Sequence, residues 1–525
     1  MEESDSQERA RRRHRWQVAL SLLALVAAAC WFTTANAARP LQTAPDSASY
    51  LCFDFSSARA ALTDFRTPGY PAFLKFAGWL SPNLQGLAAL HAIVLGLSVV
   101  IFWIGLQCHG FTPWSALAVS APLFLVGHFQ RHVATVLADF LGAALVIAAM
   151  GAMLIALSRP RRVTVWLGLG AAVFAVCLVR PAYLFLVLLV PLLGPLLLLV
   201  KPGRQGWGTL LRTGAFLFLA CVVPLSAFAA VRWATVGHFG LVSFGGMNSI
   251  GIALEMLDED GVGRLPPPLR PFAFALVHER ERWEGDRVIT ARAVDTRLLS
   301  YNRNVWRVAA PVAAKFDGDD LVRINRRCNQ TSVATFAAGR SLYFRWLAAS
   351  WPRAVNQGFS ITLEHTPFLK LSVLILGLYV VTFVLAKRTP GGVERANVIR
   401  RRNAAEMSVA ILIAGAVLLA QTLLTVLVEP PLERYASPAA IFLPAIFYLA
   451  AWHMLRETGA LVALHAGHRR ILTGEQDWGS GEDEEAFGEA RVPRRPRKAV
   501  IASLIVGAVL AAGVGVFLFL RGDGL

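Results

Sequence analysis

The chain has 525 residues, of which 55% are hydrophobic and only 16% are charged, and its mean hydropathy is +0.52. A soluble globular protein carries about 25% charged residues, so this composition excludes an ordinary soluble domain and indicates a membrane protein with several spans. The formal net charge of +17 does not indicate nucleic-acid binding, because Lys and Arg gather in short stretches between apolar runs and no nucleic-acid-binding motif is present.

The N-terminus joins a basic stretch, RARRRHRW, to an apolar run, QVALSLLALVAAACWF, which is followed by ANA at 35–37. This pattern fits a cleaved secretory signal or an uncleaved signal anchor that forms the first transmembrane helix. We expect the anchor. In either case the chain that follows emerges on the outer side of the membrane.

Apolar runs near the ~20 residues that cross a bilayer recur along the whole chain. They predict about eleven transmembrane helices, at 17–36, 84–107, 112–129, 136–157, 163–179, 181–200, 209–231, 366–386, 405–427, 434–455 and 499–520. If the runs cross the membrane in alternation, the basic stretches between them all fall on one side. The positive-inside rule predicts that this side is the cytoplasm. The N-terminus is therefore expected inside the cell.

The predicted fold is an all-α polytopic membrane protein in five parts. They are an N-terminal membrane module (1–231) with a first outer loop (37–83), a small, mostly helical outer-face domain between the seventh and eighth helices (232–365), C-terminal membrane helices (366–455), a cytoplasmic linker (456–498), and a last transmembrane helix with an outer tail (499–525). Within the linker, the acidic stretch 474–490 is poor in aliphatic residues, which predicts disorder.

The first outer loop contains a stiff polar stretch, DFRTPGYPAFLKF, at residues 64–76. Pro68 and Pro71 fix the backbone angle φ, and Gly69 permits a tight turn. Taken alone, the stretch predicts only a rigid corner that enters an apolar segment, with Arg66 at the level of the lipid headgroups.

Charged residues recur at the outer ends of other predicted helices. Asp139 lies just inside the fourth helix, Arg180 ends the fifth, and VEPPLERYASP places Glu429, Glu433 and Arg434 before the tenth. A charge within a membrane helix costs several kcal/mol, roughly 2–4, unless it is paired or lines a wet cavity. We therefore expect one polar cavity that is open to the outside.

These motifs resemble a known family. DSASY (46–50), RTPGYPAFL (66–74), the acid near the start of the fourth helix, LVRPAYLF (178–185) and ERYASP (433–438) are similar to motifs of the integral-membrane glycosyltransferases of the C superfold (GT-C), which include the protein mannosyltransferases, the aminoarabinose transferase and the catalytic subunit of oligosaccharyltransferase. The resemblance covers about the first 200 residues and the turn before the tenth helix. R-x-PGYP-x-FL is its most specific element.

The resemblance implies an enzyme that moves a sugar from a polyprenyl-phosphate carrier to a glycan, lipid or protein acceptor, by single displacement, on the extracytoplasmic face of a bacterial inner membrane. It implies that Asp46 is the catalytic base, with Asp54 or Asp64 as alternatives, and that Asp139 is a second catalytic acid. A leaving lipid phosphate suits arginine, and Arg66, Arg180 and Arg434 are the candidates. Possible substrate contacts are Tyr50, Asp54, Asp64, Tyr70, Glu433 and Tyr435.

The need for a metal is left open by the sequence. No cofactor is certain, but Asp46 and Asp139 could share a divalent ion through oxygen ligands, and His128 and His132 lie nearby in the chain. The six cysteines form no CxxC pair, which argues against a zinc site. Cys52 and Cys328 are the two expected outside; they could pair, although we expect two separate thiols.

The alternative function is a transporter or flippase for a lipid-linked sugar. A transporter carries its polar residues near the middle of the bilayer, whereas the charged residues here lie toward one face. Both readings share the lipid bilayer and a polyprenyl-linked sugar as partners, and neither involves nucleic acid.

Overall fold

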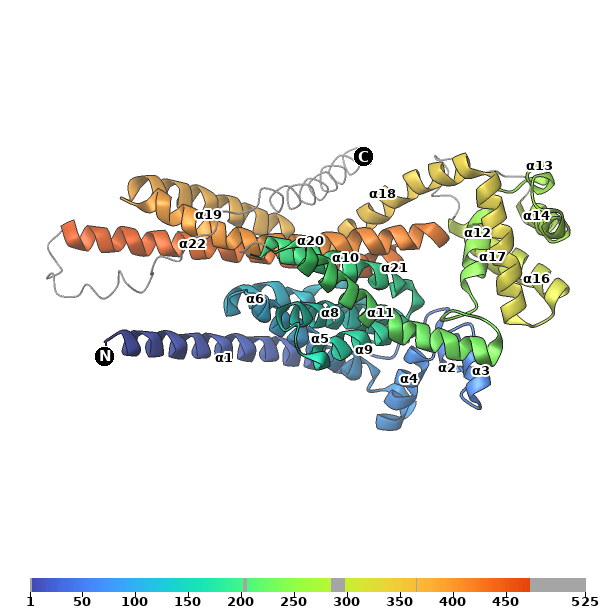
Figure 1. Ribbon diagram of the computed structural model, residues 1–525, viewed down its shortest axis with the longest axis horizontal. Helices are drawn as coiled ribbons and strands as arrows, with labels where there is room; N and C mark the ends of the chain where they lie inside the picture. Colours follow the sequence, from blue (N-terminus) through green and yellow to red (C-terminus); the bar gives the residue numbers. More distant parts are fainter. Residues whose placement is uncertain (1, 202–204, 285–297, 365, 473–525) are drawn as a thin grey trace.

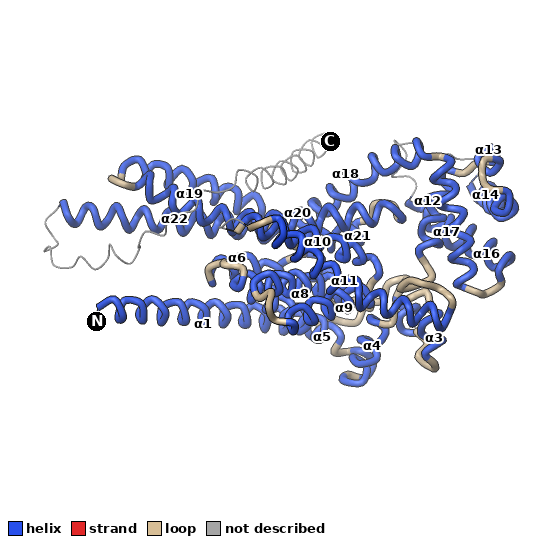
Figure 2. The backbone as a smooth tube through the Cα atoms, in the orientation of Figure 1, coloured by secondary structure: helices blue, strands red, loops and turns tan. Residues whose placement is uncertain are grey.

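The computed structural model describes residues 2–201, 205–284, 298–364 and 366–472. All regular elements in these ranges are helices, apart from one isolated parallel bridge between Gln42 and Thr135. Figures 1 and 2 show long helices that run along the longest axis of the molecule, with a group of shorter helices at one end. The expected all-α polytopic architecture is confirmed in this coarse form.

Within the described ranges, eight helical segments are long and apolar enough to cross a membrane. They are Gln7–Ala37 of α1 (Glu2–Ala37), α5 (Leu87–Cys108), α8 (Ala138–Ser158), η3 with α10 (Pro181–Val200), α11 (Trp207–Val236), α19 (Phe368–Arg388), α20 (Gly392–Val428) and Glu433–Gly467, which joins α21 (Glu433–Ala436), η8 (Ser437–Ala440) and most of α22 (Leu443–Leu472). The apolar helix α9 (Val163–Val179) is shorter, at 17 residues. The predicted helix at 499–520 lies outside the described residues, so the count of eleven stays a prediction.

The run at 112–129 differs from our expectation because it is not one helix. It is divided into α6 (Pro113–Ser120), η2 (Ala121–Leu125) and α7 (Gly127–His132). Pro122 has no N–H to donate to the preceding turn, which interrupts the helix. The segment still connects the two ends of the bundle: the Thr112 N–H donates to Glu406 Oε1 (3.1 Å), and His128 Nδ1 lies 2.7 Å from Ser437 Oγ at the other end.

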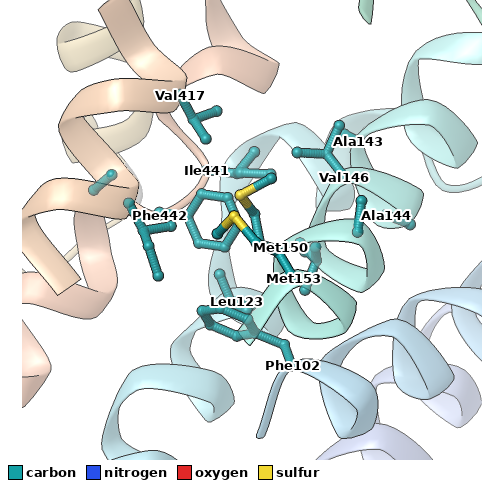
Figure 3. Close-up of a cluster of buried hydrophobic side chains, with 14 of the residues drawn as sticks. Phe102, Leu123, Ala143, Ala144, Val146, Met150, Met153, Val417, Ile441 and Phe442 are labelled. Atoms are coloured by element: carbon teal, nitrogen blue, oxygen red, sulfur yellow. The ribbon is translucent and has the colours of Figure 1, made fainter. Parts of the chain in front are cut away.

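The two ends of the bundle differ in the loops that they carry. The end with residues 38–86 and helices α12 to α18 is named the site end, and the end with the basic turns at 159–162 and 387–391 is named the basic end. Between the ends, apolar side chains fill the middle of the bundle (Figure 3). They include Phe102, Leu123, Met150, Met153, Val417, Ile441 and Phe442, all at most 2% exposed.

Close helix packing in this core depends on small residues. A Cβ added to Gly151 of α8 would lie 2.6 Å from Phe102 Cα of α5. Any side chain there would push the two helices apart, and glycine allows the backbone contact that is common between membrane helices.

The large loop is helical and has its own core. Its helices are α12 (Gly245–Met256), α13 (Glu259–Gly263), η4 (Pro267–Leu269), α14 (Arg270–Glu284), α15 (Leu298–Arg303), η7 (Asn304–Ala309), α16 (Ala310–Asp317), α17 (Leu321–Ala338) and α18 (Arg340–Glu364). Ile250, Phe272 and Val308 are fully buried among them. The helix α18 links this domain to the bundle, since Trp351 Nε1 donates to Thr422 Oγ1 of α20 (3.1 Å).

The expected linker at 456–498 begins as helix rather than as coil. The helix α22 continues through Leu472, and the Arg400 side chain of α20 pairs with Glu457 at 2.7 Å. This ion pair joins the polar stretch after residue 455 to α20. The acidic stretch 474–490 lies outside the described residues.

Candidate active site

Asp46 is positioned by a loop that is anchored on the segment before α8. Gln42 exchanges backbone hydrogen bonds with Ala134 and Val136, both at 2.9 Å, and the Ser47 hydroxyl donates to the Val136 carbonyl at 2.8 Å. Val136 precedes Asp139 by three residues. The anchoring therefore brings Asp46, from the first loop, to the site end of α8.

The RTPGYP stretch forms the start of α4 (Gly69–Leu80) and packs against the end of α9. A Cβ added to Gly69 would lie 2.5 Å from the carbonyl carbon of Leu178, so the contact requires a residue without a side chain. The Asp64 carboxylate accepts the Arg66 backbone N–H at 2.8 Å and holds the turn. Two motifs that are distant in the sequence, RTPGYP and LVRP, are thus in direct contact.

Five charged side chains meet at the site end and are named the site network: Asp46, Arg66, Asp139, Arg180 and Arg434. Arg434 Nη2 contacts both acids, at 2.6 Å from Asp46 Oδ2 and 3.3 Å from Asp139 Oδ2. Arg66 Nη2 lies 3.0 Å from Asp46 Oδ1, and Arg180 donates to Asp139. Within these five residues three cations face two carboxylates, and a third acid, the buried Glu429, lies close to Arg180 and Arg434.

Part of the site network is buried and part is accessible to solvent. The Asp139 side chain is 0% exposed and that of Arg180 is 11% exposed, whereas Asp46 and Arg434 are 26% and 29% exposed. Burial raises the pKa of Asp46, but Arg434 and Arg66 outweigh burial and hold that pKa below its ordinary value. Asp46 is therefore an ionised carboxylate that is accessible to solvent. The buried Asp139 contacts Arg180 and Arg434.

Aromatic rings support the arginines. The Arg66 guanidinium lies 4.7 Å from the centre of the Tyr50 ring, and Arg180 and Arg434 lie 5.1 Å and 5.6 Å from the Tyr435 ring. Tyr70 is fully buried and packs edge-on against Tyr50 at 5.0 Å. Tyr50 and Tyr435 therefore contact the arginines directly, whereas Tyr70 contacts the Tyr50 ring.

Three of the candidate acids do not join the site network in the described part of the chain. Asp54 is exposed and accepts the Ser56 backbone N–H at 2.7 Å, and Asp64 caps the Arg66 backbone as described above. Burial raises the pKa of Asp64. Glu433 is exposed beside Arg434. Of the acids in the first loop, only Asp46 pairs with the site-network arginines.

Three further polar residues contact the site: Glu429, which the sequence placed in the expected polar cavity, His128, which it placed near a possible metal, and Asn248, which it did not single out. Glu429 accepts a hydrogen bond from Asn248 Nδ2 of α12 at 2.6 Å, and burial raises the pKa of Glu429 despite the nearby Arg180. His128 Nε2 lies 3.3 Å from the Asp139 carbonyl. The sequence indicated Glu429 because this residue lies in a charged turn. It did not indicate Asn248, because Asn248 lies in a helix of the loop domain that is distant in the sequence.

The space between Asp46 and Asp139, which a shared ion would need, holds the Arg434 guanidinium. Among the described residues no group of three or more His, Cys, Asp or Glu has the arrangement of a metal site. Metal dependence stays an open prediction. Cys52 and Cys328 are both free thiols, and Cys328 is buried with its sulfur 3.6 Å from Met247 Sδ.

An apolar pocket of about 580 Å³ lies beside the site network. It is lined by Tyr50, Leu51, Phe53, Phe55, Ser56, Pro71, Leu74, Lys75 and Leu84. Tyr50 belongs to both places, because its ring lines the pocket and its hydroxyl accepts from Arg66 Nη1 at 3.4 Å. The pocket therefore places aromatic and aliphatic side chains next to the site-network arginines.

Comparisons with protein-family models, with curated proteins and with solved structures gave no match.

Proposed function

We propose that this protein is a polyprenyl-phosphate-sugar-dependent glycosyltransferase that acts on the extracytoplasmic face of a bacterial inner membrane. The observation that carries the proposal is the site network. In it the Arg434 guanidinium bridges the accessible, ionised Asp46 and the buried Asp139, and Arg66 and Arg180 contact the same two acids. The basic turns lie at the opposite end of the bundle, which by the positive-inside rule supports a location of the site end outside the cytoplasm.

The residue types suit a single displacement. Asp46 takes the proton of the acceptor hydroxyl as the acceptor oxygen bonds to the anomeric carbon, and the bond from that carbon to the carrier phosphate breaks. The electron pair of the broken bond leaves with the phosphate. Arg434 and Arg180 hold the resulting phosphate charge by charge-assisted hydrogen bonds.

Donor binding strengthens the base in this mechanism. In the ligand-free protein Arg434 and Arg66 hold the pKa of Asp46 low, which makes it a weak base. A phosphate that takes over Arg434 removes part of that attraction, so the pKa of Asp46 rises. Asp46 becomes a competent base only when the donor is in place, and this limits proton transfer without a donor.

The carrier lipid fits the apolar pocket beside Tyr50. Its aromatic and aliphatic lining is suited to isoprene units, and Lys75 at the same pocket, with Nζ 5.1 Å from the Phe55 ring centre, adds a positive charge for a phosphate. The pocket and the arginines together match an amphipathic donor with one anionic head.

The alternative of a transporter is less well supported. A transporter needs a polar binding region near the middle of the bundle, with access to both faces in turn. The middle of this bundle is filled by the apolar cluster around Met150, Met153 and Phe442 (Figure 3). The charged groups of the site network and the Glu406–His453 pair lie on either side of this cluster.

A reconstituted transfer assay tests the proposal. Purified protein in liposomes is incubated with a panel of polyprenyl-phosphate sugars and an extract of envelope glycans, and lipid mass spectrometry follows the release of free polyprenyl phosphate. We expect release from at least one donor by the wild type and none by Asp46→Asn. Movement of intact donor across the bilayer, without release of the phosphate, would support the transporter instead.

A further inference from the structure

A six-residue π-helix, η7 (Asn304–Ala309), interrupts the loop domain between α15 and α16. Such helices are rare and frequently occur at functional sites. The inner face of η7 is fixed: Asn304 Nδ2 donates to the Gly251 carbonyl at 3.1 Å and to Glu255 Oε1 at 2.8 Å, and Val305 and Val308 are buried. The anchored inner face leaves the next residues, Trp306 and Arg307, exposed on the outer face.

A pocket of about 540 Å³ opens on that outer face. It is lined by Trp283, Asn302, Arg303, Trp306 and Arg307. Its size falls within the range of about 300–1,000 Å³ that is usual for ligand sites. The two indoles are 47% and 51% exposed, and the Arg307 guanidinium lies 5.6 Å from the centre of the Trp283 ring. Two large rings and the Arg307 guanidinium thus lie together at one surface.

These groups match the chemistry of an acidic saccharide. Indole faces pack against the C–H faces of pyranose rings, an asparagine amide can donate to and accept from hydroxyl groups, and arginine binds carboxylate or phosphate by paired hydrogen bonds. We propose that this pocket of the loop domain binds a segment of an anionic glycan.

The pocket is connected to the site network by a row of aromatic rings. Trp306 stacks on Phe244 at 5.7 Å, Phe244 packs on Phe65 at 5.6 Å, and the Phe65 ring lies 5.1 Å from the Arg66 guanidinium. A glycan bound at Trp306 can therefore extend along one face toward Asp46. Its role as the sugar acceptor rests on the proposed glycosyl transfer, whereas glycan binding itself does not.

The position of the pocket favours a glycan over a lipid headgroup. Helix α14, which carries Trp283, and α16, which follows η7, lie at the extreme site end of the longest axis in Figure 1. In the proposed orientation this end projects into the aqueous phase, where a glycan rather than a lipid headgroup is found.

Calorimetric titration of the full-length protein in phosphatidylcholine nanodiscs tests the pocket. The probes are a tetrasaccharide of galacturonic acid and the neutral maltotetraose. We expect the acidic probe to bind more tightly, Trp306→Ala to weaken its binding about tenfold, and Arg307→Gln to bring its affinity close to that of the neutral probe. Trp207→Ala, which removes an indole that is 72% exposed at the basic end, and Arg282→Gln, which changes an exposed arginine paired with Glu279, are matched controls and should not alter binding.

Absence of binding by the wild type, or equal affinity in wild type and Trp306→Ala, overturns the proposal. Trp306-dependent binding of phosphatidylglycerol vesicles that the acidic tetrasaccharide does not displace also overturns it and assigns the pocket to lipid. The two proposals fail separately: no release of polyprenyl phosphate from any donor by the wild type refutes the glycosyltransferase and leaves the pocket standing, whereas Trp306→Ala with full binding refutes only the pocket.

Discussion

The bundle contains a buried charged cluster at each end, and the two clusters are built differently. At the basic end, Glu406 and His453 pair at 2.8 Å with side chains only 5% and 3% exposed, and each acid has its own partner, since Glu457 pairs with Arg400. In the site network, one arginine is shared by two acids, and Asp46 and Arg434 remain about a quarter exposed. Burial of charge is therefore common to both clusters. What distinguishes the proposed active site is the accessibility of Asp46 and Arg434 and the sharing of one arginine by two acids.

The largest expected effect separates Asp46 from the other acids of its loop. Asp46→Asn should reduce the rate of sugar transfer about 10²–10⁴-fold, because a positioned base is lost. Asp54→Asn is the matched control, since Asp54 is exposed and outside the site network, and should keep the wild-type rate. Transfer rates at saturating donor, measured by lipid mass spectrometry, decide between them. Loss of activity in Asp54→Asn with full activity in Asp46→Asn would mean that the wrong acid is assigned as the base.

The next effect concerns the basic-end cluster, which we expect to act on stability. Glu406→Leu leaves His453 and the Thr112 N–H without their partner, and breaking a buried pair costs about 3–5 kcal/mol. Thermal unfolding in detergent should shift strongly downward, while transfer per folded molecule stays unchanged. The double variant Glu406→Leu/His453→Leu should regain part of the lost stability. An unchanged unfolding temperature in the single variant would contradict a structural role.

A smaller effect is expected where the two motifs touch. Gly69→Ala places a Cβ 2.5 Å from the Leu178 carbonyl carbon, and overpacking of this kind costs about 1–3 kcal/mol. Because Arg66 and Arg180 flank this contact, affinity for the donor should fall along with stability. Gly168→Ala on α9, which has open space around it, is the control and should change neither. Wild-type donor affinity in Gly69→Ala would show that the contact does not position the arginines.

The charged residues of the site were predictable from the sequence, but their partners were not. The sequence indicated Asp139, Arg180 and Arg434 because a charge at the end of an apolar run can be recognised without a structure. The DSASY motif favoured Asp46 over Asp54 and Asp64, but its contact with Arg434 depends on the pairing of Gln42 with residues 134–136, which no local pattern encodes. The same holds for Asn248. Pro122 could have predicted the break in the run at 112–129. We predicted one helix there because the run is long and apolar enough to cross a membrane.

The smallest effect is the pH dependence that Asp46 contributes to stability. Its pKa is below the ordinary value in the folded protein, so its ion pairs stabilise the fold above the unfolded-state pKa of about 3.9, and this contribution is lost as pH falls through the folded pKa. The difference in unfolding temperature between wild type and Asp46→Asn should stay constant from neutral pH to about pH 4 and shrink below that. A difference that already shrinks between pH 7 and pH 5 would contradict a lowered pKa.

The most direct test of the central claim is to measure carrier binding and transfer in the same variant. Asp46 competes with the carrier phosphate for Arg434, so Asp46→Asn should bind polyprenyl phosphate at least as tightly as the wild type while transfer is lost. Titration of the reconstituted variant with polyprenyl phosphate, followed by native mass spectrometry, gives the affinity. Retained or tighter binding together with lost transfer is the result that the account predicts, and a parallel loss of binding and transfer would contradict it.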